Sequence, residues 1–133
     1  MHVGAKRILV VEDDQAVRES LAEVLSDDGF EVTCAANGRE ALERLHAAAP
    51  ALILLDLAMP VMDGWAFRAA QRRDPSVAGI PVVVLSASHG SDIPGATALG
   101  VEAFLPKPID LQRLLGTLRR LAARVSGPRA AAV

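Results

Sequence analysis

The sequence predicts an α/β domain: a doubly wound, five-stranded parallel sheet with five helices on both faces. Short apolar runs alternate with segments of helical periodicity along almost the whole chain, which is typical of parallel strands joined by crossover helices. Residues 52–55 are all Leu or Ile, the pattern of a strand that is covered on both faces. A chain of 133 residues is long enough for one such domain with a substantial core.

The first half of the chain contains three predicted strands and two predicted helices. An apolar run at 8–11 predicts the first strand. A helix is expected over 15–26, because its apolar residues share one face and Asp-Asp-Gly follows it. A short strand at 31–34 precedes a helix that begins at Asn-Gly and closes near residue 50, and the third strand is the run at 52–55.

The second half continues the alternation. We expect a helix over 64–73, a buried strand at 82–85 and a small strand at 103–105. Between these two strands, the segment 92–100 predicts a short and weak helix, since it contains one glycine and ends on another. Asp110 then caps a final helix whose leucines form one stripe.

Composition limits the classes of partner and compartment. The net charge is −2 with no basic block, so neither a nucleic acid nor a membrane surface is predicted as a partner. The single cysteine, Cys34, has no partner for an internal disulfide, and no apolar stretch approaches the ~20 residues of a membrane span. We therefore expect a cytoplasmic protein, with one domain over residues 1–124 and a flexible tail at 125–133.

Polar side chains follow four of the five predicted strands. Glu12 and Asp13 come after the first strand, Asp56 after the third, Ser86 after the fourth and Lys107 after the fifth. The carboxyl ends of parallel strands meet at one edge of the sheet, where such folds bind ligands. Clustered acids repel one another unless a cation joins them, and a hard cation held by carboxylates is the usual Mg²⁺ arrangement.

Each of these residues also has an ordinary structural interpretation. Acids after a first strand often serve a helix N-terminus, and a serine at a strand end is usually part of a turn or cap. Asp56 is harder to explain in this way, because it ends an apolar run and a buried carboxylate needs a partner. Lys107 stands out because only two of the 14 basic residues are lysine, and a compact ammonium group suits a phosphate.

Together the motifs resemble response-regulator receiver domains of the CheY-like family, over about residues 6–124. The matching segments are 8–14 (ILVVEDD), 54–60 (LLDLAMP), 62–64 (MDG), 84–87 (VLSA) and 104–108 (FLPKP). The resemblance implies the strand order 2-1-3-4-5 of flavodoxin-like sheets. It also implies a single-domain response regulator of a two-component system or phosphorelay, which is not an enzyme and which takes its phosphoryl group from a sensor histidine kinase or a histidine phosphotransfer protein.

The resemblance also implies a role for each matching acid. Asp56 corresponds to the phosphoacceptor. Glu12 and Asp13 correspond to the acidic pair that holds Mg²⁺, Asp13 directly and Glu12 through water. The backbone carbonyl of Ala58 corresponds to a further ligand of the metal.

The remaining matching residues correspond to the phosphoryl contacts and the switch. Ser86 matches the hydroxyl that bonds the phosphoryl group, and Lys107 matches the lysine that pairs with it, followed by a cis bond to Pro108. Phe104 occupies the aromatic switch position, where a tyrosine is common in the family. Because phenylalanine has no hydroxyl, this switch cannot end in a phenol hydrogen bond.

Three other functions remain open on the residues alone. A Mg²⁺-dependent phosphohydrolase of the haloacid-dehalogenase type has a second aspartate two residues after the nucleophile, where this chain has Ala58. A flavodoxin-like cofactor binder needs a phosphate loop after the first strand, where this chain has three acids. The third alternative is a receiver that is never phosphorylated and acts only through contacts.

Overall fold

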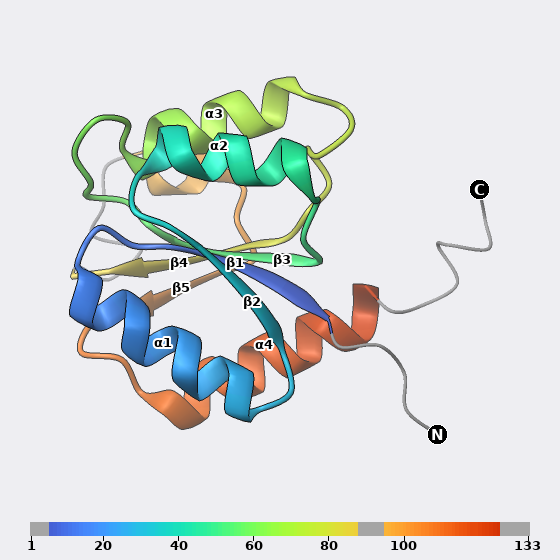
Figure 1. Cartoon of the computed structure of the whole chain (residues 1–133). Coiled ribbons are helices and arrows are strands. Elements are labelled where there is room, and N and C mark those ends of the chain that lie inside the picture. Colours follow the sequence, from blue (N-terminus) through green and yellow to red (C-terminus); the bar gives the residue numbers. More distant parts are fainter. Residues whose placement is uncertain (1–5, 88–94, 126–133) are drawn as a thin grey trace.

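The computed structural model describes residues 6–87 and 95–125, and its five strands form one parallel sheet in the order β2-β1-β3-β4-β5 (Figure 1). The predicted fold class and strand order are therefore confirmed. The strands are Arg7–Val11 (β1), Glu31–Ala35 (β2), Leu52–Asp56 (β3), Val82–Ser86 (β4) and Ala103–Pro106 (β5).

Four α-helices cover the sheet within the described residues. They are Gln15–Asp27 (α1), Gly38–Ala47 (α2), Gly64–Arg73 (α3) and Leu111–Val125 (α4). Helices α1 and α4 lie on one face of the sheet, and α2 and α3 lie on the other (Figure 1). None of the helices in the described residues is long and apolar enough to span a membrane.

The expected number of five helices is wrong. Within the described residues, the segment predicted as a weak helix contains only a four-residue 3₁₀ turn, Ala96–Leu99 (η2), and residues 92–94 lie outside the described part. Gly95 and Gly100 flank the turn with φ values of 78° and 62°, a conformation that an α-helix does not contain. The tail predicted at 125–133 also lies outside the described residues, except for Val125, which ends α4.

The core is divided between the two faces because strand side chains alternate. Ile8 and Val10 pack in the layer under α1 and α4, whereas Leu9 and Val11 pack in the layer under α2 and α3. Every residue of β3 and β4 is buried, as expected for central strands covered on both sides.

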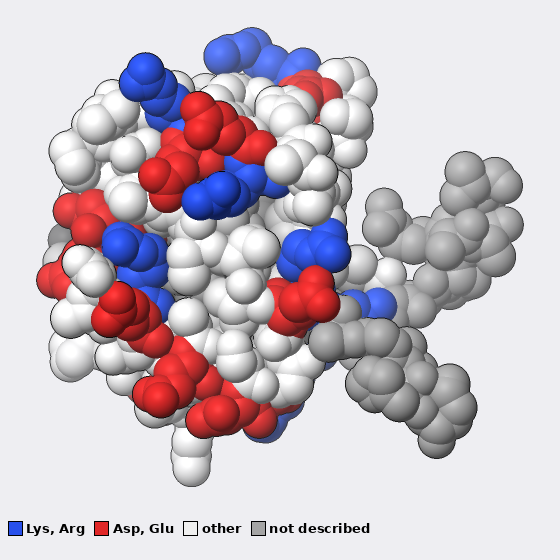
Figure 2. Space-filling model, in the orientation of Figure 1, with Lys and Arg blue, Asp and Glu red and all other residues white. Residues whose placement is uncertain are grey.

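Each α-helix in the described residues begins with a polar side chain that caps its N-terminus. The side chains of Asp14, Asn37 and Asp63 cap α1, α2 and α3 by accepting a backbone N–H three residues further on, and Asp110 does the same for α4. The helix N-termini therefore lie at the edge where the strands end, next to the predicted site. Figure 2 shows acidic and basic side chains interspersed over one face of the molecule.

Candidate functional site

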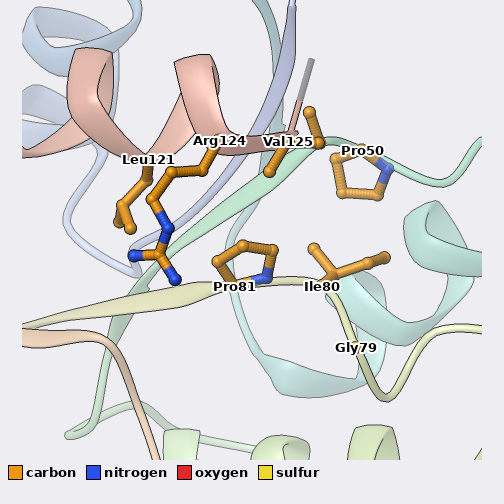
Figure 3. A pocket seen from close by; sticks show the side chains of 8 residues that line it. Pro50, Gly79, Ile80, Pro81, Leu121, Arg124 and Val125 are labelled. Atoms are coloured by element: carbon orange, nitrogen blue, oxygen red, sulfur yellow. The ribbon is translucent and has the colours of Figure 1, made fainter. Parts of the chain in front are cut away.

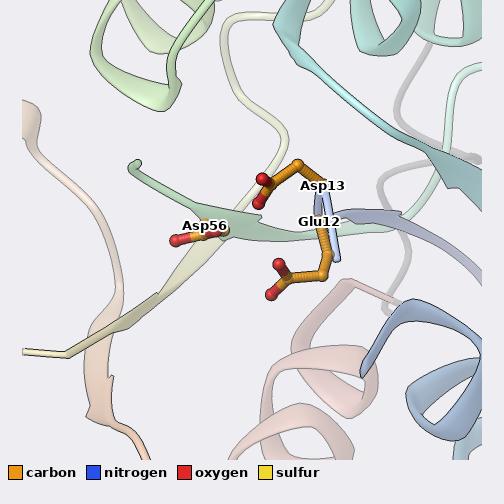
Figure 4. Close-up of side chains that lie close together, drawn as sticks. All are labelled: Glu12, Asp13 and Asp56. Carbon is orange, nitrogen blue, oxygen red and sulfur yellow. The ribbon is translucent and has the colours of Figure 1, made fainter. Parts of the chain in front are cut away.

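Three carboxylates meet at the carboxyl edge of the sheet. Glu12 and Asp13 follow β1 and Asp56 ends β3, and each offers an oxygen atom within 4.8 Å of the others. Figure 4 shows the side chains of Asp13 and Glu12 above and below β1 in that view, with both carboxylates turned towards Asp56. Strands β1 and β3 are neighbours in the sheet, so their pairing brings Asp13 close to Asp56, 43 positions further along the chain. We call this cluster, with Lys107, the acidic edge.

Two of these acids are buried, which makes their mutual repulsion strong. Glu12 is 1% exposed and Asp56 is 6% exposed, whereas Asp13 is exposed. The Nζ atom of Lys107 lies 3.0 Å from Oε1 of Glu12 and 3.7 Å from Oδ2 of Asp56. The sequence predicts a lysine beside the phosphoacceptor, but its shorter contact is with Glu12. One ammonium group therefore serves two buried carboxylates.

The electrostatic consequence is clearest at Asp56. Burial and the neighbouring charge of Glu12 raise the pKa of Asp56 to about 6, against the lowering effect of Lys107. Burial alone would lower the pKa of Lys107, but its hydrogen bond to Glu12 and the charge of Asp56 raise that pKa above its usual value. Both shifts indicate a site with an excess of negative charge.

Strands β4 and β5 place the other two predicted side chains at the same edge. Ser86 ends β4, is 9% exposed and stands next to the Asp56–Leu85 pair of the ladder. Its backbone carbonyl accepts the N–H of Lys107 at 2.8 Å, and the Lys107–Pro108 bond is cis. Strands β3, β4 and β5 are consecutive in the sheet, so Asp56, Ser86 and Lys107 lie close together although they are far apart in the sequence.

The loop after β3 is held close to Asp56 by a glycine. The N–H of Gly64 donates to the Leu57 carbonyl at 2.9 Å, and a Cβ atom at position 64 would lie 2.6 Å from the Asp56 carbonyl oxygen. Only glycine permits this approach of α3 to the end of β3. Within the loop, the N–H of Ala58 donates to Oδ1 of Asp56 at 3.3 Å, so the backbone orients the carboxylate.

Comparison with known proteins agrees with this geometry. The model of the response regulator receiver domain matches residues 8–119. The chain belongs to this family. As a receiver domain, it is part of two-component signalling.

Several relatives show how far the similarity extends. The receiver domain is 39% identical over 122 residues to the response regulator MprA of Mycolicibacterium vanbaalenii and 41% identical over 120 residues to Rre1 of Synechocystis. These matches cover 90% and 88% of this chain but 52% of each relative, so the chain spans about half the length of these curated relatives. The structure of the chemotaxis regulator CheY4 of Vibrio cholerae matches with 33% identity and a TM-score of 0.82, over 88% of this chain and 98% of CheY4.

A second solved structure is similar to the same extent. The signal receiver domain of a histidine kinase from Syntrophus aciditrophicus matches with 33% identity and a TM-score of 0.85, over 92% of this chain and 94% of that one. The solved structures that match thus include a chemotaxis response regulator and the receiver domain of a histidine kinase.

The acidic edge of this receiver domain fits a divalent cation. Its donors are carboxylate oxygens, which are hard ligands of the kind that Mg²⁺ prefers. Three acids face one lysine, and a cation would relieve the repulsion that raises the pKa of Asp56. The residues that would hold it are Glu12, Asp13 and Asp56.

Phe104 lies on β5, one strand away from Ser86. It pairs with Val84 in the ladder, is half-buried and packs against the core layer of α2 and α3. The structure therefore places the predicted switch residue beside the strand that carries Ser86. Its role as a switch is a prediction.

A cavity at the opposite edge carries different chemistry. It has a volume of about 260 Å³ and lies at the amino ends of β3 and β4 (Figure 3). Its lining consists of Pro50, Ala51, Gly79, Ile80, Pro81, Leu121, Arg124 and Val125. The lining contains neither a carboxylate nor a thiol, and Arg124 is paired with Glu102 at 3.4 Å.

One residue near the acidic edge was not predicted from the sequence. Arg18, in the first turn of α1, donates from Nη1 to the backbone carbonyls of Glu12 and Asp13 at 2.8 and 3.4 Å. The helical periodicity around Arg18 does not indicate this contact, because the acceptors are backbone atoms of the preceding loop and not a recognisable side chain.

Proposed function

We propose that this receiver domain accepts a phosphoryl group on Asp56, with Mg²⁺ bound at the acidic edge, and changes a protein-binding surface in response. The observation that carries the proposal is a buried aspartate at a strand end, with two acids on one side and Lys107 within 3.7 Å. A buried carboxylate with other acids around it is energetically unfavourable, so its presence indicates a functional site that binds a ligand.

In the proposed reaction, a carboxylate oxygen of Asp56 attacks the phosphorus of a phosphohistidine or of a small phosphodonor. The new bond joins this oxygen to phosphorus. With phosphohistidine, the phosphorus–nitrogen bond breaks, and the electron pair and then a proton go to the imidazole; with acetyl phosphate, the phosphorus–oxygen bond breaks and acetate leaves with the electron pair. Bound Mg²⁺, held by Glu12, Asp13, Asp56 and the Ala58 carbonyl, supplies charge neutralisation. The Lys107 ammonium pairs with another phosphoryl oxygen.

The product carries more negative charge than the free carboxylate. We propose that the Ser86 hydroxyl then donates to a phosphoryl oxygen and that Phe104 turns towards the space next to β4. Such a change shifts an existing equilibrium by the difference in affinity of the phosphoryl group for the two states.

The proposed role is that of an acceptor rather than of a phosphatase. Position 58, where a general acid would be needed for turnover, holds alanine, so release of phosphate is expected to be slow. The phosphoryl source is proposed to be a sensor histidine kinase or a histidine phosphotransfer protein. Because the chain spans about half the length of the curated relatives, its action as a single-domain regulator stays a prediction. Its cytoplasmic location and its lack of nucleic-acid and membrane partners are also predictions.

The test uses acetyl phosphate with Mg²⁺ and measures the mass of the intact protein. The wild type is expected to gain one phosphoryl group, and Asp56→Asn none. Asp63→Asn is the matched control, because it alters another acid of the same segment and asparagine still caps α3. Labelling of Asp56→Asn to the extent of the wild type would sink the proposal, and so would labelling that is independent of Mg²⁺.

A second assay separates the acceptor from a phosphatase. The protein is incubated with p-nitrophenyl phosphate and Mg²⁺, and the release of phosphate is followed. We expect no sustained turnover. Many turnovers per protein molecule would favour the phosphohydrolase instead.

A further inference from the structure

Glu12 and Asp13 are consecutive residues, and Figure 4 shows their side chains leaving the chain above and below β1 in that view, with both carboxylates turned towards Asp56. In an extended strand, consecutive side chains point to opposite faces. Glu12 still donates its N–H to the Ala35 carbonyl at 3.0 Å, as a strand residue does, whereas Asp13 lies in a bend. The direction of the Asp13 side chain towards Asp56 therefore depends on the conformation of the chain at this bend.

Three contacts hold this bend. The N–H of Asp14 donates to Oε2 of Glu12 at 3.1 Å, and Oδ1 of Asp14 accepts the N–H of Val17 at 3.1 Å. The third contact is that of Arg18, whose Nη1 donates to both the Glu12 and the Asp13 carbonyl. The Arg18 contact is the one that reaches the backbone of both acids.

The two carbonyls belong to the two peptide groups that flank the Cα atom of Asp13. Each peptide group is planar, so the conformation of a residue is set by the orientation of these two planes. A donor that holds both carbonyls therefore restrains φ and ψ of Asp13, and with them the direction of its Cα–Cβ bond.

We propose that Arg18 is a positioning residue for the cation site: it holds the two peptide planes around Asp13 and so keeps the Asp13 carboxylate turned towards Asp56. The inference rests on the proposed function, because the site is taken to bind Mg²⁺. Arg18 acts through Asp13 and does not contact the phosphoryl group. Partners of this kind, one step behind the ligands, commonly change metal affinity about 10- to 100-fold when they are removed.

The length of the side chain explains why arginine is needed. The Nη1 atom of arginine is one bond further from Cα than Nζ of lysine and two bonds further than Nε2 of glutamine. Arg18 is half-buried at the start of α1, so the helix cannot move closer without disturbing its packing. A shorter donor at this position is expected to leave the carbonyls of Glu12 and Asp13 without the contact.

The test measures the Kd of Mg²⁺ by calorimetric titration in Arg18→Gln, Arg18→Lys and the wild type. We expect the Kd to rise about 10- to 100-fold in Arg18→Gln and by less in Arg18→Lys, which keeps the charge. Arg44→Gln is the matched control. Arg44 also donates from a helix to a backbone carbonyl, that of Cys34 at 3.1 Å, but on β2, so its Kd should stay at the wild-type value.

A second measurement is made without metal. Amide hydrogen exchange at Asp14, whose N–H is bonded to Glu12, should become faster in Arg18→Gln and stay unchanged in Arg44→Gln. A merely structural role of Arg18 would lower the free energy of unfolding and speed exchange along α1, while leaving the Kd unchanged.

The outcomes separate the two proposals. Wild-type protein that binds no Mg²⁺ overturns both. If the wild type binds Mg²⁺ and Arg18→Gln binds it equally well, the role of Arg18 is overturned and the proposed function stands. Should Arg18→Gln fail to fold, Arg18→Lys decides, because a Kd equal to that of the wild type contradicts the argument from side-chain length.

Discussion

At the acidic edge, Lys107 contacts two of three clustered carboxylates, whereas on the α3 face the buried guanidinium of Arg68 donates to three neutral oxygens. Arg68 is 7% exposed. It donates to the carbonyls of Leu99 and Gly100, both at 2.9 Å, and to the amide oxygen of Gln71 at 2.6 Å. Gln71 is fully buried and donates in turn to the carbonyls of Val77 and Ile80. We call these contacts the Arg68 network.

The two regions differ in what surrounds the buried charge: hydrogen-bond acceptors in the Arg68 network, and further negative charge at the acidic edge. In the Arg68 network, the donors of one side chain meet the last carbonyls of the η2 segment, where a cation is favoured. Burial lowers the pKa of Arg68, but a guanidinium stays charged in proteins. At the acidic edge, burial and like charge instead raise the pKa of Asp56. The first region is built to hold the fold, and the second is suited to bind a cation.

The largest effect is expected where the satisfied network is broken. Arg68→Ala leaves three acceptors without their donor and should lower the free energy of unfolding by about 3–5 kcal/mol. Arg72→Ala is the control, because exposed Arg72 makes one bond to a neighbouring carbonyl, that of Ala98, and should cost about 1 kcal/mol or less. Urea unfolding at neutral pH measures both. Equal losses in the two variants would contradict the importance of burial.

The next effect comes from adding Mg²⁺, which the acidic edge is proposed to bind. Mg²⁺ at 100 times its Kd should raise the free energy of unfolding of the wild type by about 2.7 kcal/mol. Asp13→Asn should lose this increase and unfold like the wild type without metal, since Asp13 is exposed. Thermal unfolding with Mg²⁺ and with a chelator checks both statements. If Mg²⁺ does not raise the free energy of unfolding of the wild type, the acidic edge is not a metal site.

A smaller effect is expected when the charge of Asp56 is removed without metal. The pKa of Asp56 is about 6 in the folded protein, above the ordinary 3.8, so the folded state binds its proton more tightly than the unfolded state. Its contribution to stability is therefore present below about pH 4 and lost as the pH rises to about 6. Asp56→Asn should be more stable than the wild type at neutral pH by about 1–3 kcal/mol.

The pH profile in a chelating buffer is the measurement for Asp56→Asn. The difference between variant and wild type should shrink as the pH falls from about 6 to 4. A difference of constant size across this range would assign the gain to packing rather than to charge.

The same contrast explains what the sequence could predict. The strands were recognisable because residues such as Ile53 and Val84 are apolar in runs, and Asp56 and Lys107 because they break a pattern. Arg18 and Arg68 were not predicted, since each bonds to backbone carbonyls that the sequence does not position; Arg68 and Leu99 are 31 residues apart. The segment predicted as a fifth helix shows the same limit: its described part, η2, is a 3₁₀ turn flanked by glycines with positive φ, which the periodicity does not reveal.

The smallest effect is expected at a charge pair on the surface, between α2 and the segment after α3. His46 contacts Asp74 through Nε2 and the Leu42 carbonyl through Nδ1, both at 2.8 Å. A neutral imidazole has one N–H, so only the protonated ring can donate to both acceptors. The hydrogen bond to Asp74 and the one to Leu42 raise the pKa of His46 above 6.5. The pair therefore stabilises the fold fully below about pH 6.5, and this contribution is lost as the pH rises through the raised pKa.

His46→Gln should remove this step. Its urea midpoint should fall below that of the wild type at about pH 6 and equal it at about pH 9. Asp74→Asn should lose the same step and, in addition, the bonds from Ser76 to Asp74, at every pH. Because His46 is exposed and Asp74 is partly exposed, salt should weaken the effect of His46→Gln, while that of Arg68→Ala should persist. If the loss of stability in His46→Gln did not depend on salt, the imidazole would act through packing. The difference in exposure would then not explain why the Arg68 network contributes more to stability.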